Sequence, residues 1–443
     1  MADRPGATRR RPSSTRVIND VRPTIKCARG PRPMISYEEA RRFVLSDLKP
    51  LPPKEIELQH ALGLVAAGIV SAREPSPRFA NSSMDGFALQ ANDTESGEVR
   101  LKIVDTIFAG DLATTRLKTG EAARIMTGAP IPDGADSVCM REETLVDPEG
   151  DVVLIQRTIR PGEFVRLVGD DVAVGQALVG IGSVIGPALL GVLASQGIDT
   201  VFAHPRPRVG VLSTGNELSD SRGELEAGKI RDANRPSLLA SLARSDFTPV
   251  DLGIAGDTPG EITEAFERGV LSCDAIISTG GVSVGDADFV KSVLTDLVGD
   301  SARSMQVAIK PGKPFAFAVA PSGMPFFGLA GNPVSTLVGF ELFVRPALRL
   351  LAGQSELNRP TFTMILDCPL PRRRDGKLHL VHVTARSHHD GRLHVKSVAR
   401  QASHLLNAIA DANAIALIPD GDGLDTGQEV EAMVIDNNQL NGA

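Results

Sequence analysis

The sequence predicts a multidomain protein of the α/β plus β class, with a central parallel α/β domain, an inserted β-domain and a C-terminal β-barrel-like domain. From Arg208 onward, short apolar runs alternate with helical patterns, which is typical of a parallel sheet with crossover helices. Residues 72–171 and the residues after about 355 instead carry short apolar runs between Gly, Pro and Asp turns, a pattern typical of small β-domains. The length of 443 residues also exceeds what one hydrophobic core usually fills.

Composition excludes several classes of protein. Hydrophobic residues make up 42% and charged residues 23%, as in ordinary globular proteins. One Tyr, no Trp and a net charge of −7 argue against a nucleic-acid-binding surface. Glycines interrupt the most apolar stretch, 172–198, so no membrane span is expected there. None of the four cysteines forms a C-x-x-C pair, so we expect neither a zinc site nor a disulfide framework, and a reducing, cytoplasmic compartment fits.

The first 33 residues differ from the rest. They hold eight Arg and one Lys against two Asp, a net charge of +7. We expect residues 1–33 to form a disordered basic tail, and an organellar transit peptide or an upstream extension of the reading frame are the other interpretations. Folded structure is expected from Met34, because Ser36 and Glu39 have the spacing of a capping box at the start of a helix.

The remaining chain divides into four predicted domains. Residues 34–52 and 206–354 form the α/β domain, 53–71 and 176–205 a linker domain, 72–175 the inserted β-domain and 355–443 the C-terminal β-domain. A helix is expected from Ser36 to about Leu48, and a β-hairpin followed by a helix from Pro187 to Gly197 in the linker domain. In the α/β domain we expect strands at 209–212, 248–254 and 275–277, and helices at 236–244, 259–270, 288–297 and 334–351.

Acidic side chains follow the first two of these strands. Glu217 comes after the Ser213–Gly215 turn, and Asp257 lies just before a predicted capping box formed by Thr258 and Glu261. Because the carboxyl ends of parallel strands share one edge of a sheet, the two carboxylates could share a hard cation such as Mg²⁺. Glu217 could equally be a solvated residue in the first turn of a helix.

Three further loops have the composition of anion sites. The loop after the third strand carries small and glycine residues that can expose backbone N–H groups, namely Gly280, Gly281, Ser283 and Gly285. Two prolines stiffen the segment that displays Lys310 and Lys313, which suits binding of an oxyanion or a phosphate. Asn332 and Ser335 lie where the long helix at 334–351 begins.

Six motifs occur together and in order: Ser-Ser-Met-Asp-Gly-Phe-Ala from Ser82, Thr-Gly-Ala-Pro from Thr127, Ser-Thr-Gly-Asn-Glu-Leu from Ser213, Gly-Gly-Val-Ser-Val-Gly-Asp from Gly280, Lys-Pro-Gly-Lys-Pro from Lys310 and Gly-Asn-Pro-Val-Ser from Gly331. In this set the chain resembles the MoeA family of molybdopterin molybdotransferases and the E domain of gephyrin, over roughly residues 35–435. The resemblance implies insertion of molybdate into adenylylated molybdopterin, with Mg²⁺ and release of AMP. It also implies an elongated homodimer, held by the linker domain, whose active-site clefts lie between the two chains.

The resemblance assigns residues as well as chemistry. Site residues would be Asp85, Thr127 and Asp171 in the inserted domain and Glu217, Asp257 and Asp288 in the α/β domain, while Lys310, Lys313, Ser335 and Ser403 would hold molybdate. Many family members have an Arg near the position of His382. That Arg is absent here, so His382 or Arg386 would have to substitute, and a neutral imidazole attracts an oxyanion less than a guanidinium does.

Two other functions remain open at this stage. One is the adenylylating enzyme of the same pathway, whose domain resembles residues 206–354 and which is also a possible partner. The other is a non-catalytic, gephyrin-like scaffold. The sequence does not distinguish molybdate from tungstate as the substrate.

Overall fold

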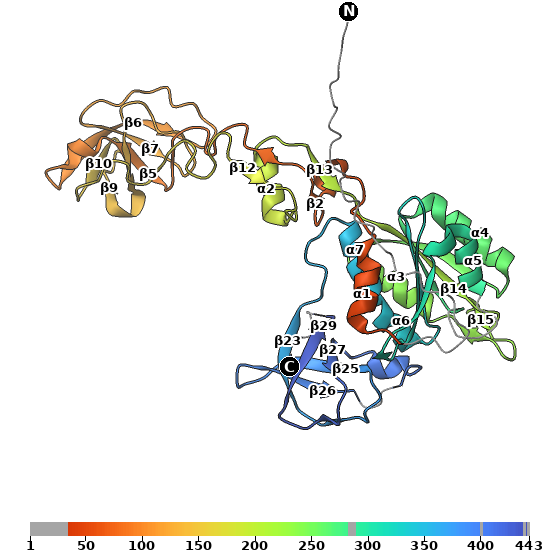
Figure 1. Ribbon diagram of the computed structural model, residues 1–443. Helices are drawn as coiled ribbons and strands as arrows, with labels where there is room; N and C mark the ends of the chain where they lie inside the picture. Colours follow the sequence, from red (N-terminus) through yellow and green to blue (C-terminus); the bar gives the residue numbers. More distant parts are fainter. Residues whose placement is uncertain (1–33, 282–288, 399–401, 437–439, 441–443) are drawn as a thin grey trace, which may run out of the picture.

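The computed structural model describes residues 34–281, 289–398, 402–436 and 440, so the predicted basic tail lies outside the described part. The molecule is elongated, with the inserted β-domain at one end and the α/β and C-terminal domains together at the other (Figure 1). The linker domain, with its helix α2 (Pro187–Ser195), lies between them (Figure 1). Among the residues with described positions, no helix combines the length and apolar character that crossing a bilayer requires.

The central sheet of the α/β domain has the strand order β17-β14-β18-β22-β21-β19. Its strands are β14 (Arg208–Thr214), β17 (Thr248–Ala255), β18 (Ala275–Thr279), β19 (Arg303–Gln306), β21 (Pro314–Val319) and β22 (Pro325–Leu329). The first four in the order are parallel, which confirms the α/β layout. The sheet is nevertheless mixed, because a tight turn at 320–324 joins β21 to β22 without a crossover helix and so makes them antiparallel.

Helices cover both faces of this sheet. They are α1 (Tyr37–Ser46), α3 (Asn234–Arg244), α4 (Pro259–Ser272), α5 (Phe289–Val298), α6 (Pro333–Gly339) and α7 (Arg345–Leu351). The capping box of α1 is confirmed, since Ser36 Oγ accepts the Glu39 N–H and the Glu39 carboxylate accepts the Ser36 N–H. One apolar core lies beneath α1, α3, α6 and α7, and a second lies beneath α4 and α5 on the opposite face (Figure 1).

Two helices depart from the predicted bounds. α3 begins two residues before Pro236, because Asp232 Oδ1 accepts the N–H groups of Asn234 and Arg235 and so caps an earlier turn. The helix predicted over 334–351 is interrupted by a π-helical turn at Phe340–Val344. Pro346 has no N–H to donate to the Leu342 carbonyl, four residues earlier, which disturbs the regular α-helical ladder at this point.

The linker domain contains β1 (Lys54–Glu57), β2 (Val65–Ala66), β3 (Val70–Ser71), β12 (Ala177–Val179) and β13 (Thr200–His204). The predicted helix at Pro187 is confirmed as α2. The predicted hairpin before it is wrong, because β12 pairs with β3 and Val184 bridges to Val65. Segments on the two sides of the insertion therefore pair with each other, which closes the linker domain around its own apolar core.

The inserted domain is built on a six-stranded sheet of order β8-β5-β7-β6-β10-β9, with an additional β4–β11 pair. The strands are β4 (Asn81–Ser82), β5 (Gly86–Leu89), β6 (Val99–Ile107), β7 (Glu121–Ile125), β8 (Ser137–Met140), β9 (Thr144–Val146), β10 (Val152–Ile155) and β11 (Val165–Arg166). Two apolar clusters pack against this sheet. The strand-rich domain that the turn spacing predicts is confirmed.

The C-terminal domain is a closed barrel. Its strands are β23 (Thr361–Leu366), β25 (Leu378–Ser387), β26 (Leu393–Ser397), β27 (Ala414–Ile418) and β29 (Glu429–Val434), with a short β24–β28 pair (Leu370–Pro371 and Gly423–Leu424) beside them. The β25–β27 pairing closes the ring of strands, as predicted for a barrel-like domain. The strand β20 (Ile309–Lys310) leaves the α/β domain and pairs with the start of β25, so the barrel is joined to the loop that carries the two lysines.

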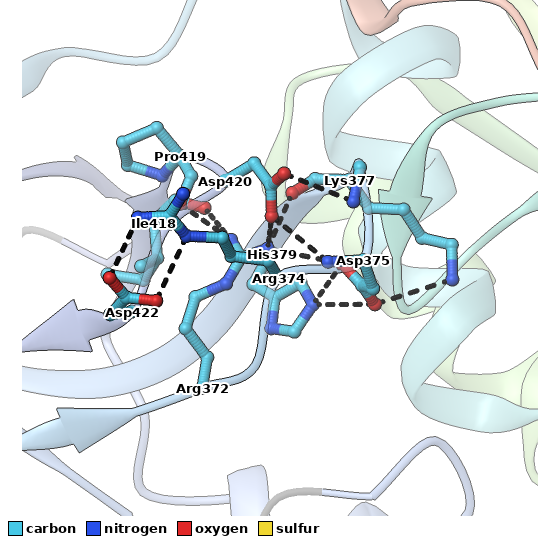
Figure 2. A network of polar contacts seen from close by, with 10 residues as sticks. Arg372, Arg374, Asp375, Lys377, His379, Ile418, Pro419, Asp420 and Asp422 are labelled. Atoms are coloured by element: carbon cyan, nitrogen blue, oxygen red, sulfur yellow. Dashed lines mark hydrogen bonds and ion pairs between the residues drawn. The ribbon is translucent and has the colours of Figure 1, made fainter.

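A polar network holds the start of β25 in place (Figure 2). The guanidinium of Arg372, whose side chain is only 3% exposed, donates to the carbonyls of Ile418, Pro419 and Lys377. It also contacts the carboxylates of Asp375 and Asp420. These partners come from both the 371–377 loop, which leads into β25, and the end of β27. The buried guanidinium of Arg372 therefore stabilises the contact between β25, the strand that pairs with β20, and β27.

We expect Arg372→Ala to lower the local unfolding free energy of the barrel by about 1–3 kcal/mol, since it leaves three carbonyls and two partly exposed carboxylates without their buried donor. Hydrogen exchange of the β25 and β27 amides measures this change. Arg374→Ala is the matched control. The side chains of Arg374 and Asp422 are 71% and 81% exposed, so their ion pair contributes at most about 1 kcal/mol to the free energy of unfolding. Equal effects of the two substitutions would show that burial of Arg372 does not stabilise the barrel.

Candidate functional site

Four strand ends of the central sheet meet at one edge. β17, β14, β18 and β22 are parallel neighbours, so the segments that follow them lie side by side. These segments begin with Gly215, Gly256, Gly280 and Ala330. The edge therefore gathers the predicted acidic and glycine-rich loops in one place.

Asp257 is fixed to the neighbouring loop by two hydrogen bonds. The Asn216 N–H donates to Asp257 Oδ2, and the Asp257 N–H donates to Asn216 Oδ1, both at 3.1 Å. The carboxylate of Glu217 lies against Gly215, where an added Cβ would come within 2.6 Å of Glu217 Oε2. Asp257 and Glu217 thus lie on adjoining loops whose separation is set by Asn216.

The two carboxylates have a donor set that fits Mg²⁺. Within the described part of the chain, neither Glu217 nor Asp257 takes part in an ion pair with a basic side chain. Glu217 is exposed and Asp257 is half-buried, so both are open to a hydrated ion. Hard cations prefer such oxygen ligands and keep several waters.

The capping box predicted at Thr258 is only half formed. Thr258 Oγ1 accepts the Glu261 N–H, as expected. Glu261 does not return a bond to the cap residue; its carboxylate accepts the Gly256 N–H at 2.6 Å. The Glu261 side chain therefore reaches past the cap and fixes the turn that carries Asp257, since Gly256 directly precedes that residue.

Gly280 sets the close approach of β18 to β14. Its φ is +94°, and an added Cβ would lie 2.4 Å from the Thr214 carbonyl oxygen. Asn234 ties the same edge together, since its amide donates to Thr279 Oγ1 at 2.8 Å and to the Gly331 carbonyl at 2.7 Å. The Gly280 N–H is itself bonded to the Leu329 carbonyl, so this amide is a structural donor.

The lysine loop reaches the same edge of the sheet. β21 is antiparallel to β22, so its first residue, Pro314, lies beside the carboxyl end of β22. Lys310 and Lys313 are both exposed on this loop, and the buried Gly312 between them lies near the Ser335 carbonyl. The structure thus brings the two lysines to the edge that carries Glu217 and Asp257.

Ser403 and Asn332 meet at the start of α6. Asn332 Nδ2 donates to Ser403 Oγ at 3.2 Å, and the Val334 N–H donates to the Ser403 carbonyl at 3.1 Å. Ser335 is only 5% exposed. The predicted anion site at this helix start is therefore partly closed by the C-terminal domain, which supplies the Ser403 carbonyl to one of its N–H groups.

The site residues of the inserted domain form a separate group. Asp85 Oδ1 accepts both the backbone N–H of Thr127, at 2.7 Å, and its hydroxyl, at 2.8 Å. These two hydrogen bonds, the backbone one first, lower the pKa of the Asp85 carboxyl. Asp171 is exposed on a turn, and its backbone N–H donates to the Ser76 carbonyl. Within one chain, this domain lies at the far end of the molecule from the central sheet (Figure 1).

His382 does not supply the missing cation. It is 2% exposed in β25, and burial lowers its pKa to about 4, so the imidazole is neutral at physiological pH. Arg386 is exposed and its guanidinium contacts the Asp367 carboxylate at 3.4 Å. Arg386 carries a positive charge, but it pairs with His394, seven residues along β25 from His379, the partner of Lys310. Neither suggested substitute therefore places a cation beside the lysine loop.

Sequence reasoning missed two positioning residues. Asn216 lies inside a motif from which only Glu217 was selected, and Asn234 begins α3 in the polar run Asp232–Arg235. Polar residues at the start of a helix, here Asp232, Asn234 and Arg235, would have been the sequence signal that Asn234 makes side-chain hydrogen bonds there. Ser283, Gly285 and Asp288 lie outside the described residues.

Comparison with known proteins identifies the family. Sequence-family profiles match residues 35–197 ("MoeA N-terminal region (domain I and II)"), 210–350 ("Probable molybdopterin binding domain") and 367–435 ("MoeA C-terminal region (domain IV)"). The molybdopterin molybdenumtransferase of Haemophilus influenzae is 34% identical over 386 residues, which are 87% of this chain and 94% of that protein. The chain belongs to the MoeA family.

Other MoeA-type proteins match as fully. Molybdopterin molybdenumtransferase 2 of Mycobacterium tuberculosis is 35% identical over 395 residues, which are 87% of this chain and 96% of that protein. The crystal structure of a molybdopterin biosynthesis MoeA protein from Pyrococcus horikoshii superposes with a TM-score of 0.74 at 26% identity, and covers 91% of this chain and 100% of that chain. The match to the MoeA structure covers 91% of the chain, and the family profiles include the inserted and C-terminal domains.

We expect Gly280→Ala to disturb this edge more than an ordinary glycine substitution. The added Cβ must move the Thr214 backbone, which costs about 1–3 kcal/mol beyond the strain of a positive φ. Thermal unfolding of the full chain measures the loss. Gly150→Ala is the control, because Gly150 has a φ of +81° but nothing within 4 Å of its added Cβ. A similar destabilisation in both variants would contradict the close contact.

Proposed function

We propose that this chain is a molybdopterin molybdotransferase, which inserts molybdate into adenylylated molybdopterin and releases AMP. The observation that carries the proposal is that Glu217, Asp257, Lys310 and Lys313 all lie along one edge of the central sheet. An acidic pair suits a hard cation and a lysine pair suits an oxyanion, so the edge can hold both charges that the reaction brings together. The curated relatives named molybdopterin molybdenumtransferase support the same activity.

The proposed mechanism is mainly positioning and charge stabilisation. Glu217 and Asp257 would hold Mg²⁺, which when bound neutralises charge on the phosphates of the adenylylated pterin. Asn216 keeps the Asp257 carboxylate oriented through the reciprocal hydrogen bonds described above. Lys310 and Lys313 would bind the molybdate oxyanion and hold it beside the pterin. Attack of a molybdate oxygen on the adenylyl phosphorus would break the phosphoanhydride bond, so that AMP leaves with that oxygen. The two dithiolene sulfurs would then bind molybdenum, and their protons would leave with a second molybdate oxygen as water.

The inserted domain would act on the partner chain of a homodimer. Asp85 and Thr127 form an ordered polar pair, yet within one chain the inserted domain that carries them lies far from the central sheet (Figure 1). A two-fold dimer would allow the inserted domain of one chain to complete the sheet-edge site of the other. Contact with the adenylylating enzyme remains a prediction from the resemblance alone.

The fold favours this activity over the two alternatives. An adenylyltransferase confined to the α/β domain would need neither the inserted domain nor the barrel, whereas the relatives match over both. A scaffold without catalysis would need no pair of carboxylates outside the ion pairs described for this chain. Consumption of ATP would support the first alternative, and failure to bind molybdate in a calorimetric titration would support the second.

We expect Asp257→Ala to reduce AMP release from adenylylated molybdopterin by about 100-fold or more, because it removes a charge that stabilises the phosphate site. A purified assay with Mg²⁺ and molybdate measures the rate. Glu264→Ala, an exposed carboxylate on α4, is the control and keeps the wild-type rate. Full AMP release by Asp257→Ala would refute the role of this residue.

The two-chain site can be tested by mixing variants that are inactive alone. When equal amounts of Asp85→Ala and Lys313→Ala exchange subunits, half of the dimers contain one chain of each variant. Because the two substitutions lie in different domains, each mixed dimer has one site without a substitution and one site with both. We expect about a quarter of the wild-type activity, as two-fold symmetry requires. Glu217→Ala mixed with Lys313→Ala changes the same domain and stays inactive. Recovery in neither mixture, with exchange confirmed by mass spectrometry, would place each site within a single chain.

A further inference from the structure

The turn between β25 and β26 gathers three side chains of the kinds that bind transition metals. They are His388, Asp390 and His394, and their ligand atoms all lie within 4.8 Å of one another. Neither the proposed reaction nor the family motifs use this turn. It lies at the opposite end of β25 from the pairing with Lys310, about 30 Å along a ten-residue strand.

Asp390 lies between the two imidazoles. Its Oδ1 is 3.3 Å from His388 Nδ1, and its Oδ2 is 3.1 Å from His394 Nε2. In a tetrahedral zinc site, with bonds of about 2.0–2.1 Å, neighbouring ligand atoms are about 3.3 Å apart. Each observed nitrogen–oxygen separation is close to one edge of such a site, but the two imidazoles contact different oxygens of Asp390. Binding of both imidazoles and one carboxylate oxygen to the same ion therefore requires the stacked rings to turn toward that oxygen.

A second carboxylate orients the buried histidine. His394 is 8% exposed, and its Nδ1 lies 2.7 Å from Asp367 Oδ1, on the adjoining segment after β23. Metal-binding histidines commonly make such a contact through the nitrogen that does not bind the metal, which directs the other nitrogen at the ion. Here that other nitrogen is Nε2, the atom that faces Asp390.

The turn itself is held by backbone hydrogen bonds. The His388 N–H donates to the Arg392 carbonyl, and the Arg392 N–H donates to Asp390 Oδ1 at 3.0 Å. The rings of His388 and His394 stack with centroids 4.0 Å apart. Strand pairing, stacking and the turn thus hold the three ligand side chains close together before any ion binds.

We propose that His388, Asp390 and His394 form a binding site for a divalent transition-metal ion such as Zn²⁺, with water as the fourth ligand. Imidazole nitrogen with one carboxylate is a donor set that zinc accepts and that Mg²⁺ does not favour. The absence of C-x-x-C pairs led us to expect no zinc site, but that expectation considered cysteine ligands only. The same side chains could instead act as a metal-free ion-pair cluster, and the test separates the two.

The direct test is Zn²⁺ titration of the untagged full-length protein by calorimetry, with Co²⁺ absorption as a second readout of tetrahedral geometry. The wild type is expected to bind one Zn²⁺ per chain at this site. His388→Ala should weaken binding roughly 100-fold or more, beyond the range that loss of an outer partner causes, and Asp367→Asn should weaken it about 10–100-fold. Asp390→Asn provides a second ligand variant that preserves the size of the side chain.

Two controls keep the result specific. His389→Ala changes the neighbouring exposed histidine, whose ring packs against His388 in a tilted arrangement but is outside the ligand group. Cys368→Ser removes the half-buried thiol next to Asp367. Both controls should keep wild-type Zn²⁺ affinity. Unchanged affinity in His388→Ala and Asp390→Asn, or an equal loss in His389→Ala, would overturn the proposal and leave an ion-pair cluster.

Discussion

The contact between β18 and β14 at the carboxyl edge of the central sheet constrains the rest of the site. Gly280 lies so close to the Thr214 carbonyl that no side chain fits between them. This approach brings the loop after β18 beside the loop that carries Glu217, and Asn234 then joins Thr279 to the end of β22. Because β21 returns antiparallel from the same edge, the lysine loop arrives there too. The backbone scaffold therefore places acidic and basic side chains along the same edge of the sheet.

The elongated shape separates the polar residues of the inserted domain from the carboxyl edge of the central sheet (Figure 1). Asp85 accepts two hydrogen bonds from Thr127, so its carboxylate is fixed and stays ionised to a lower pH than usual. An ordered acidic group of this kind is of little use to a site at the other end of the same chain (Figure 1). The linker domain explains how the separation is maintained, since strands from both sides of the insertion pair within it and pack on one core. In the proposed homodimer, the inserted domain of a second chain would reach this edge without any bending of the first chain.

Local signals in the sequence predicted most elements correctly, and the failures share a physical cause. Periodicity and caps located α1, α2 and three of the four parallel strands, β14, β17 and β18, because those signals depend on neighbouring residues. The β12 pairing was mispredicted because its partner, β3, is about a hundred residues away in the sequence. A complete capping box was predicted at Thr258, but the Glu261 carboxylate accepts the Gly256 N–H and not the N–H of the cap residue. Only the folded turn brings Gly256 within reach of Glu261. Asn216 and Asn234 were missed for the same reason: their roles lie in contacts across the sheet edge and not in their own segments.

The two groups of possible metal ligands in this chain have different chemistry. At the sheet edge, exposed carboxylates leave room for the water molecules that Mg²⁺ retains, and their oxygen atoms do not attract a softer ion strongly. In the β25–β26 turn, two imidazoles and a carboxylate lie in a more enclosed setting, with Asp367 behind the more buried ring. Borderline ions such as Zn²⁺ favour nitrogen donors, and the order of affinities along the first transition row strengthens this preference. In the proposed reaction, a tightly held transition ion beside Glu217 and Asp257 would compete with the Mg²⁺ expected there. The separation of the imidazoles from the sheet edge, at the far end of β25, would keep the two kinds of ion apart.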